Sequence, residues 1–260
     1  MTDRAQTAGN QQNASGVNDF VEIVKTVAYA LLIALFLRVL LFQPFTIPSA
    51  SMEPTLLEGD YIIVTKFSYG YSRHSIPFSP PLFDGRVLER KPERGDVVVF
   101  KLPRDSSTDY IKRLIGLPGD RVQMRRGRLW VNGEQIPAKE LPPVMMDSGY
   151  GFTRSVQRFE ETFPNGRTFV TYDFGPSGDV DDTQTFVVPE GHYFFMGDNR
   201  DNSLDSRVPA QENGVGFVPA ENLVGKAQII LLSWNPGASL FKPWTWVTDA
   251  RPSRFFNVLK

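Results

Sequence analysis

Hydrophobic and polar positions divide the chain into stretches of different pattern. Residues 1–17 are small and polar, and we expect a flexible tail without regular structure that extends to residue 22. Residues 24–42 are almost wholly apolar, VKTVAYALLIALFLRVLLF. As a helix this run rises about 28 Å, close to the roughly 30 Å of a bilayer's hydrocarbon layer. The pattern predicts a transmembrane anchor over residues 23–43, with Lys25 and Arg38 reaching toward opposite membrane surfaces.

From residue 44 onward the pattern predicts a mainly β fold. Short apolar runs are bounded by Gly, Pro, Asp or Asn, which is typical of strands joined by turns. The pair Asn132-Gly133 between two apolar segments predicts a tight hairpin. The runs that we expect to be strands are residues 61–64, 96–100, 110–111, 128–131, 168–171, 192–196 and 228–232.

The composition of residues 44–260 also divides this part of the chain into segments. Residues 124–189 are richer in charge, Gly and Pro than their flanks, so we expect an inserted β-rich subdomain there. The flanking residues 44–123 and 190–260 would then form one antiparallel β-rich core. A chain of 260 residues is long enough for such a core to be well buried.

The composition of the chain limits which residue types could carry out catalysis. The chain has no cysteine, which excludes disulfides, thiolate metal sites and cysteine nucleophiles. Its two histidines, His74 and His192, belong to no H-E-x-x-H pattern, so we expect no metal. A net charge of −1 gives no reason to expect nucleic acid as a partner. The chemistry must therefore come from Ser, Lys, Asp or Glu, and no cofactor is implied.

Two segments carry that chemistry. Ser49 and Ser51 lie a few residues beyond the anchor, and Lys112 lies in an apolar strand-like run. A lysine has a reference pKa near 10.4, and lowering it by about two units through burial costs ~3 kcal/mol, which the fold must supply. Arg113 should point to the opposite face of the strand, where its charge can reach water. Taken alone, Ser51 could also be a turn or helix-cap serine, and the two cations could be solvated strand charges.

Four blocks of sequence, in this order after the anchor, resemble bacterial type I signal peptidases (leader peptidases). These are membrane-bound endopeptidases with a Ser-Lys dyad that remove signal peptides from exported preproteins. The resemblance implies that Ser51 is the nucleophile, that Lys112 is the general base, and that an acyl-enzyme on Ser51 leads to cleavage after a small-x-small motif. The blocks are residues 48–56 (PSASMEPTL), 94–100 (RGDVVVF), 110–120 (YIKRLIGLPGD) and 197–207 (GDNRDNSLDSR).

The same resemblance implies further roles. Ser49 matches an oxyanion-hole hydroxyl that acts with the backbone N–H of Ser51, and Ser203 matches a serine that orients the lysine. Asp205 and Arg207 match a structural pair beside the site. Shallow pockets for small substrate side chains match a larger set of positions, whose alternative role is core packing. These are Phe45, Ile47, Pro48, Met52, Leu56, Ile62, Val99, Tyr110 and Ile111.

The resemblance also implies partners and a location. The partners are secretory preproteins and the lipid bilayer, with no nucleic acid. The location is the bacterial inner (cytoplasmic) membrane, crossed once, with the catalytic domain on the outer, periplasmic face. The chain departs from the family pattern after Arg207, where residues 208–215 form a longer loop than usual.

Other interpretations stay open at this point. The apolar run could be a buried core helix, or a signal peptide cleaved near residues 49–51. The Ser-Lys pair also occurs in self-cleaving regulators of the LexA type, which are soluble, and residues 239–242 (SLFK) match the S-x-x-K of β-lactamase-like enzymes without their partner motifs. A tethered, noncatalytic β domain that binds exported peptides is the alternative from another class of protein.

Overall fold

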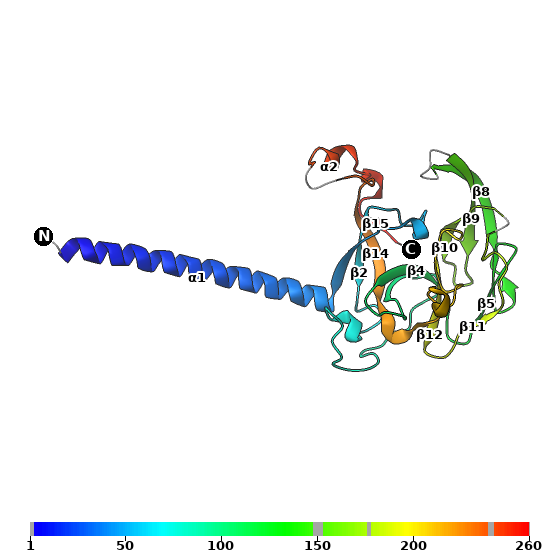
Figure 1. Ribbon diagram of the computed structural model, residues 1–260, viewed down its shortest axis with the longest axis horizontal. Coiled ribbons are helices and arrows are strands. Elements are labelled where there is room, and N and C mark those ends of the chain that lie inside the picture. Colours follow the sequence, from blue (N-terminus) through cyan, green and yellow to red (C-terminus); the bar gives the residue numbers. More distant parts are fainter. Residues whose placement is uncertain (1–2, 148–152, 176–177, 239–241, 260) are drawn as a thin grey trace. The chain divides into compact units, whose positions relative to one another are not determined.

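The computed structural model describes residues 3–147, 153–175, 178–238 and 242–259. It consists of two compact units, Met1–Leu41 and Phe42–Lys260. The first unit is helix α1 (Asp3–Leu40), and the second is mainly β (Figure 1). The expected fold class is therefore confirmed.

Helix α1 contains one segment that is long and apolar enough to cross a membrane, Asp19–Leu40. None of this segment is buried inside the protein, which excludes the alternative of a buried core helix. The structure also extends the helix back to Asp3, through residues that we expected to be a tail without structure. Ordinary polar residues have helix propensities within about 0.7 kcal/mol of alanine, so a helix can continue through them from an apolar segment.

The second unit is built on an eight-stranded antiparallel sheet. Its strands lie in the order β1-β2-β14-β3-β4-β12-β13, and β15 also pairs with β14. Strand β4, which contains Lys112, lies between β3 and β12 in this sheet. The bounds are β1 Phe42–Thr46, β2 Asp60–Thr65, β3 Val97–Lys101, β4 Asp109–Gly116, β12 His192–Met196, β13 Val218–Pro219, β14 Leu223–Ser233 and β15 Asn257–Val258.

Two smaller sheets come from the stretch between β4 and β12. One has the order β10-β9-β8 and the other β11-β5-β6-β7. Both lie within residues 121–187, close to the expected inserted segment, although the limits of that subdomain stay a prediction because residues 42–260 form one unit. The bounds are β5 Arg121–Arg125, β6 Arg128–Val131, β7 Glu134–Gln135, β8 Ala138–Asp147, β9 Thr153–Thr162, β10 Thr168–Asp173 and β11 Phe186–Val187.

The expected hairpin is confirmed. Val131 of β6 faces Glu134 of β7, which leaves Asn132 and Gly133 as a two-residue loop. Both loop residues have positive φ, 56° and 85°, as the tight hairpin turn requires.

Short helical turns complete the second unit. They are η1 Ala50–Met52, η2 Arg73–Ser75, η3 Ala210–Glu212, η4 Ala220–Asn222, α2 Thr245–Thr248 and η5 Pro252–Arg254. Turn η1 is the important one, because it carries Ser51. Met52 and Leu56, which follow that serine, and Ile47, which precedes it, are buried in an apolar cluster with residues of β2, β3 and β14, so the turn is fixed to the sheet.

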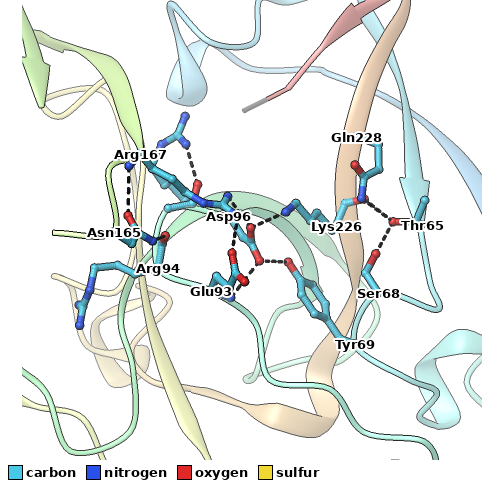
Figure 2. Close-up of polar contacts among 12 residues, drawn as sticks. Thr65, Ser68, Tyr69, Glu93, Arg94, Asp96, Asn165, Arg167, Lys226 and Gln228 are labelled. Carbon is cyan, nitrogen blue, oxygen red and sulfur yellow. Dashed lines mark hydrogen bonds and ion pairs between the residues drawn. The ribbon is translucent and has the colours of Figure 1, made fainter. Parts of the chain in front are cut away.

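A buried carboxylate ties three distant segments together. Asp96 lies just before β3 and is 2% exposed. Its Oδ1 accepts from Arg167 Nη1 and from Lys226 Nζ, each at 2.7 Å, and the Tyr69 hydroxyl donates to Oδ2 at 2.9 Å (Figure 2). Burial opposes ionisation, but hydrogen bonds from Lys226 and from the Glu93 backbone bring the pKa of Asp96 below its usual value. The cluster joins the β9–β10 turn to β14 and to the start of β3, next to the strand that carries Lys112.

Candidate active site

Ser51 lies in turn η1, which begins four residues after β1 ends. Its backbone carbonyl accepts from the Asn199 N–H at 3.1 Å, and the carbonyl of Ala50 accepts from the Asn199 side-chain amide at 3.1 Å. The segment after β12 therefore holds the turn from the other side. The Ser51 side chain is only 8% exposed, so its hydroxyl has a fixed and largely dry environment.

Lys112 lies in the middle of β4, opposite Val98 of β3. It is 4% exposed, and its Nζ lies 2.5 Å from Ser51 Oγ. The Nζ also lies 5.5 Å from the centroid of the Tyr110 ring. No carboxylate lies within ion-pair distance of this amine in the part of the chain that the structure describes. The structure thus brings the two expected residues into direct contact.

Burial lowers the pKa of Lys112 to about 8. The carboxylates of Asp205 and Asp198 favour the ammonium and limit this shift, while the Arg207 charge adds to it. With a pKa of about 8, roughly a quarter of the amine is neutral at pH 7.5. A neutral amine in contact with a serine hydroxyl can accept its proton.

Ser49 lies on the same side of the turn. Its Oγ is 3.4 Å from Ser51 Oγ, and its backbone is extended, with φ −144° and ψ 154°. A hydroxyl at this distance can donate to an oxyanion that forms on a carbonyl carbon bound to Ser51 Oγ.

Ser203 is near the turn, and its role in orienting the lysine stays a prediction. Its hydroxyl makes no hydrogen bond to Lys112 among the residues described. It packs instead against Gly197, where an added Cβ would lie 2.3 Å from Ser203 Oγ and 2.4 Å from the Ser51 carbonyl oxygen. Only a glycine at position 197 lets the two segments come this close.

Asp205 and Arg207 form the expected pair. Arg207 Nε and Nη2 each donate to the Asp205 carboxylate at 2.9 Å, and both side chains are buried. Burial would raise the pKa of Asp205, but the Arg207 charge and hydrogen bonds lower it below its usual value. Asp205 also accepts from the Gly197 N–H at 3.0 Å, so the pair fixes the segment that packs against Ser51.

The expectation that Arg113 reaches water is wrong. Arg113 is 2% exposed and donates to both oxygens of Asp198, at 2.7 and 2.6 Å. The opposite face of β4 is also covered, since the Phe169 ring of β10 lies 4.2 Å from the guanidinium carbon. Thr55 Oγ1 donates to Asp198 as well, at 2.5 Å, so this ion pair connects β4 to the segment that carries Ser51. The sequence analysis missed this ion pair, because no local sequence pattern links positions 113 and 198.

A cavity of about 380 Å³ opens over the Ser-Lys pair. Of the residues expected to bind substrate, Pro48, Tyr110 and Ile111 line it. Phe45 is partly buried and packs against the apolar cluster beneath. The remaining five have exposures of 2% or less and are core residues of that cluster: Ile47, Met52, Leu56, Ile62 and Val99.

A serine hydroxyl beside a desolvated amine, at the base of an open cavity, is the arrangement of a candidate hydrolase. The chain matches the model of one family, signal peptidase, peptidase S26, over residues 20–234. It is 45% identical to a signal peptidase I of Rickettsia typhi, in an alignment that covers 89% of this chain and 90% of that protein. It is 42% identical to a signal peptidase I of Rickettsia prowazekii, in an alignment that covers 96% of this chain and 98% of that protein.

The chain therefore belongs to the signal peptidase family, peptidase S26. Membership makes it a peptidase whose substrates are preproteins with signal peptides, and helix α1 fits anchoring in a membrane. Among solved structures, the chain is similar to a crystal structure of a signal peptidase I from Enterococcus faecalis V583. The two are 28% identical, the match covers 53% of this chain and 97% of the other, and the TM-score is 0.30.

Proposed function

We propose that this peptidase is a serine endopeptidase that uses Ser51 as nucleophile and Lys112 as general base, and that it cleaves signal peptides after a small-x-small motif. The observation that carries the proposal is the 2.5 Å contact between Lys112 Nζ and Ser51 Oγ in a buried setting. The lowered pKa of Lys112, about 8, supports it, because a base must be neutral before it can act.

The first half of the reaction forms an ester on the enzyme. Neutral Lys112 takes the proton from Ser51 Oγ as that oxygen bonds to the carbonyl carbon of the scissile peptide bond. The carbonyl oxygen becomes an oxyanion, which Ser49 Oγ and the Ser51 N–H stabilise. The intermediate then collapses, the C–N bond breaks, and the Lys112 ammonium returns its proton to the leaving nitrogen. The products of this half are the mature protein's free amine and a signal peptide esterified to Ser51.

The second half hydrolyses that ester. Lys112, neutral again, takes a proton from a water molecule, whose oxygen attacks the ester carbonyl through a second oxyanion. Collapse breaks the bond to Ser51 Oγ, which recovers its proton from Lys112, and the signal peptide leaves with a carboxyl group. No cofactor takes part in either half, and the buried Asp205–Arg207 pair keeps the neighbouring segment in place.

Substrate selection follows from the cavity over the dyad. Pro48, Tyr110 and Ile111 give it apolar walls, and its volume is about 380 Å³. Such a cavity favours small apolar side chains next to the scissile bond, whereas burying a charge there without a partner would be unfavourable. We further propose that α1 crosses the inner membrane once, in contact with the lipid bilayer, and that the second unit lies on the periplasmic side, where exported preproteins emerge.

The test is cleavage of a secretory preprotein by the full chain in detergent, with the cut site read by mass spectrometry. Wild type should cut after a small-x-small motif, while Ser51→Ala and Lys112→Ala should be folded and inert. Matched controls are Ser155→Ala and Lys139→Ala, which change exposed residues of β9 and β8 and should cut at the wild-type rate. If the two dyad variants fold and still cut, the assignment fails. If wild type cuts no preprotein, a tethered peptide-binding domain becomes the better account.

A further inference from the structure

A second, larger cavity lies beside the one over the dyad. Its volume is about 640 Å³, within the range of about 300–1,000 Å³ that is usual for ligand pockets. The two cavities share two lining residues, Asn202 and Leu204. Asn202 and Leu204 therefore form the border between them, and we call these two residues the ridge. Any extended peptide that lies over Ser51 and continues across this ridge enters the second cavity.

The second cavity carries negative charge. Asp179 and Asp201 line it, and Asp179 is exposed. Asp201 Oδ2 accepts from the Phe174 N–H at 2.6 Å, but its Oδ1 accepts no hydrogen bond from any residue that the structure describes. Arg200 also lines the cavity, but both ends of its guanidinium are held by Glu161, at 2.8 and 2.6 Å. The lining arginine is thus already neutralised.

Two further carboxylates lie behind the wall. Asp173 and Asp181 are buried, and a Cβ added to Gly178 would lie 2.4 Å from Asp201 and 3.2 Å from Asp181. Burial raises the pKa of both Asp173 and Asp181, and the nearby Asp201 charge adds to that rise. Cations also lie near these groups: Arg154, whose guanidinium carbon is 3.2 Å from the centroid of the Phe174 ring, Arg128, whose charge acts on Asp173, and Arg207, whose charge acts on Asp181. Among the described residues that line the cavity itself, the charged groups are the two carboxylates and Arg200, which is paired with Glu161.

The two cavities differ in the chemistry that they favour. The cavity over the dyad has apolar walls from Pro48, Tyr110 and Ile111, which suit the small apolar end of a signal peptide, and the carboxylate that lines it, Asp109, is paired with Lys101 at 3.0 Å. An apolar chain would gain little beside the exposed carboxylate of Asp179, whereas a polar chain can solvate it. The mature part of a preprotein, which follows the scissile bond, is the polar part of the substrate.

We propose that the second cavity binds the first residues of the mature protein, and that Asp179 and Asp201 make it select against acidic side chains there. The proposal rests on the proposed function, since it needs a preprotein held across Ser51. A partly exposed charge pair contributes about 0.2–1 kcal/mol, so each acidic side chain should lower kcat/KM by about 1.4- to fivefold and each basic one should raise it by a similar factor.

The experiment uses the full chain in detergent and three preproteins that differ only in the second residue after the cut: Lys, Ala or Glu. The measured quantity is the ratio of kcat/KM for the Lys substrate to that for the Glu substrate. Wild type should give a ratio well above one, which falls as salt is added. Asp179→Asn and Asp201→Asn should each reduce the ratio, and the double variant should bring it close to one. Both changes are isosteric, and the first lies at an exposed position, so folding should survive.

The matched control is Asp182→Asn, at an exposed aspartate of the same loop that does not line the cavity and whose Oδ1 accepts from the Arg126 N–H. It should leave the ratio unchanged. If wild type cleaves all three substrates with a ratio of one, or if Asp182→Asn lowers the ratio as much as Asp179→Asn does, the cavity is not the binding site and the proposed function still stands. If wild type cleaves none of the three, the proposed function fails, and this subsite fails with it.

Discussion

Raising the pH from 6 to 9 should increase the rate of preprotein cleavage by roughly 90-fold, because the base must be neutral. Burial lowers the pKa of Lys112 to about 8. With that pKa about 1% of the amine is neutral at pH 6 and about 90% at pH 9. The lysine loses a proton as the pH rises, so the rate should climb about tenfold per pH unit well below 8 and level off above it. An unperturbed lysine would instead place the midpoint above pH 10.

The assay is kcat/KM at constant ionic strength from pH 5.5 to 10, with a substrate that has no titratable group near the scissile bond. The midpoint then reports the free enzyme. His74 should interfere little above pH 7, because burial lowers its pKa below its usual 6.5. A rate that is flat from pH 6 to 9, with chemistry rate-limiting, would refute the assignment of Lys112 as the base. So would a midpoint above pH 10, since it would show that the lysine is not desolvated.

Three further changes test parts of the site. Lys112→Met should raise the free energy of unfolding at pH 7 by about 1–3 kcal/mol in urea denaturation, because it removes a buried amine that burial disfavours in its charged form; a less stable variant would contradict this. Gly197→Ala should be destabilised and inactive, because its Cβ would lie 2.3 Å from Ser203 Oγ and 2.4 Å from the Ser51 carbonyl oxygen; cleavage at the wild-type rate would show that this approach is unimportant. Ser49→Ala should lower kcat by about 10²- to 10³-fold, and an unchanged kcat would remove Ser49 from the oxyanion hole.

Much of the sheet could be predicted from local pattern. All seven expected strands lie wholly or partly within strands of the structure, because each combined β-branched or aromatic residues with turn residues at its ends. Among the strands that were not expected, β8 and β9 are the longest. Their residues are largely polar or exposed, and β8 contains Pro142 and Pro143, so their pairing depends on each other and on β10 rather than on an apolar run.

The candidate site was predictable in its residue types and less so in its contacts. Ser51 and Lys112 were identified from their sequence blocks, and the structure brings them together. The burial of Arg113 could not be foreseen, because alternation along a strand gives the face of a side chain but not what covers that face. Its partner Asp198 is 85 residues away, and the Phe169 ring above it comes from a different sheet. The burial of Ile47 and Val99 in the core could likewise not be predicted, because core packing and substrate contact require the same apolar residues.

The most direct test of the central claim is to find the acyl group on Ser51. A peptide ester with the small-x-small sequence is mixed with the full chain, quenched in acid within the first turnover, and digested for mass spectrometry. The account predicts that the acyl mass appears on the peptide that contains Ser51, at that residue, and is absent from Ser51→Ala. An acyl group on Ser49 or Ser203, or hydrolysis by Ser51→Ala at the wild-type rate, would contradict it.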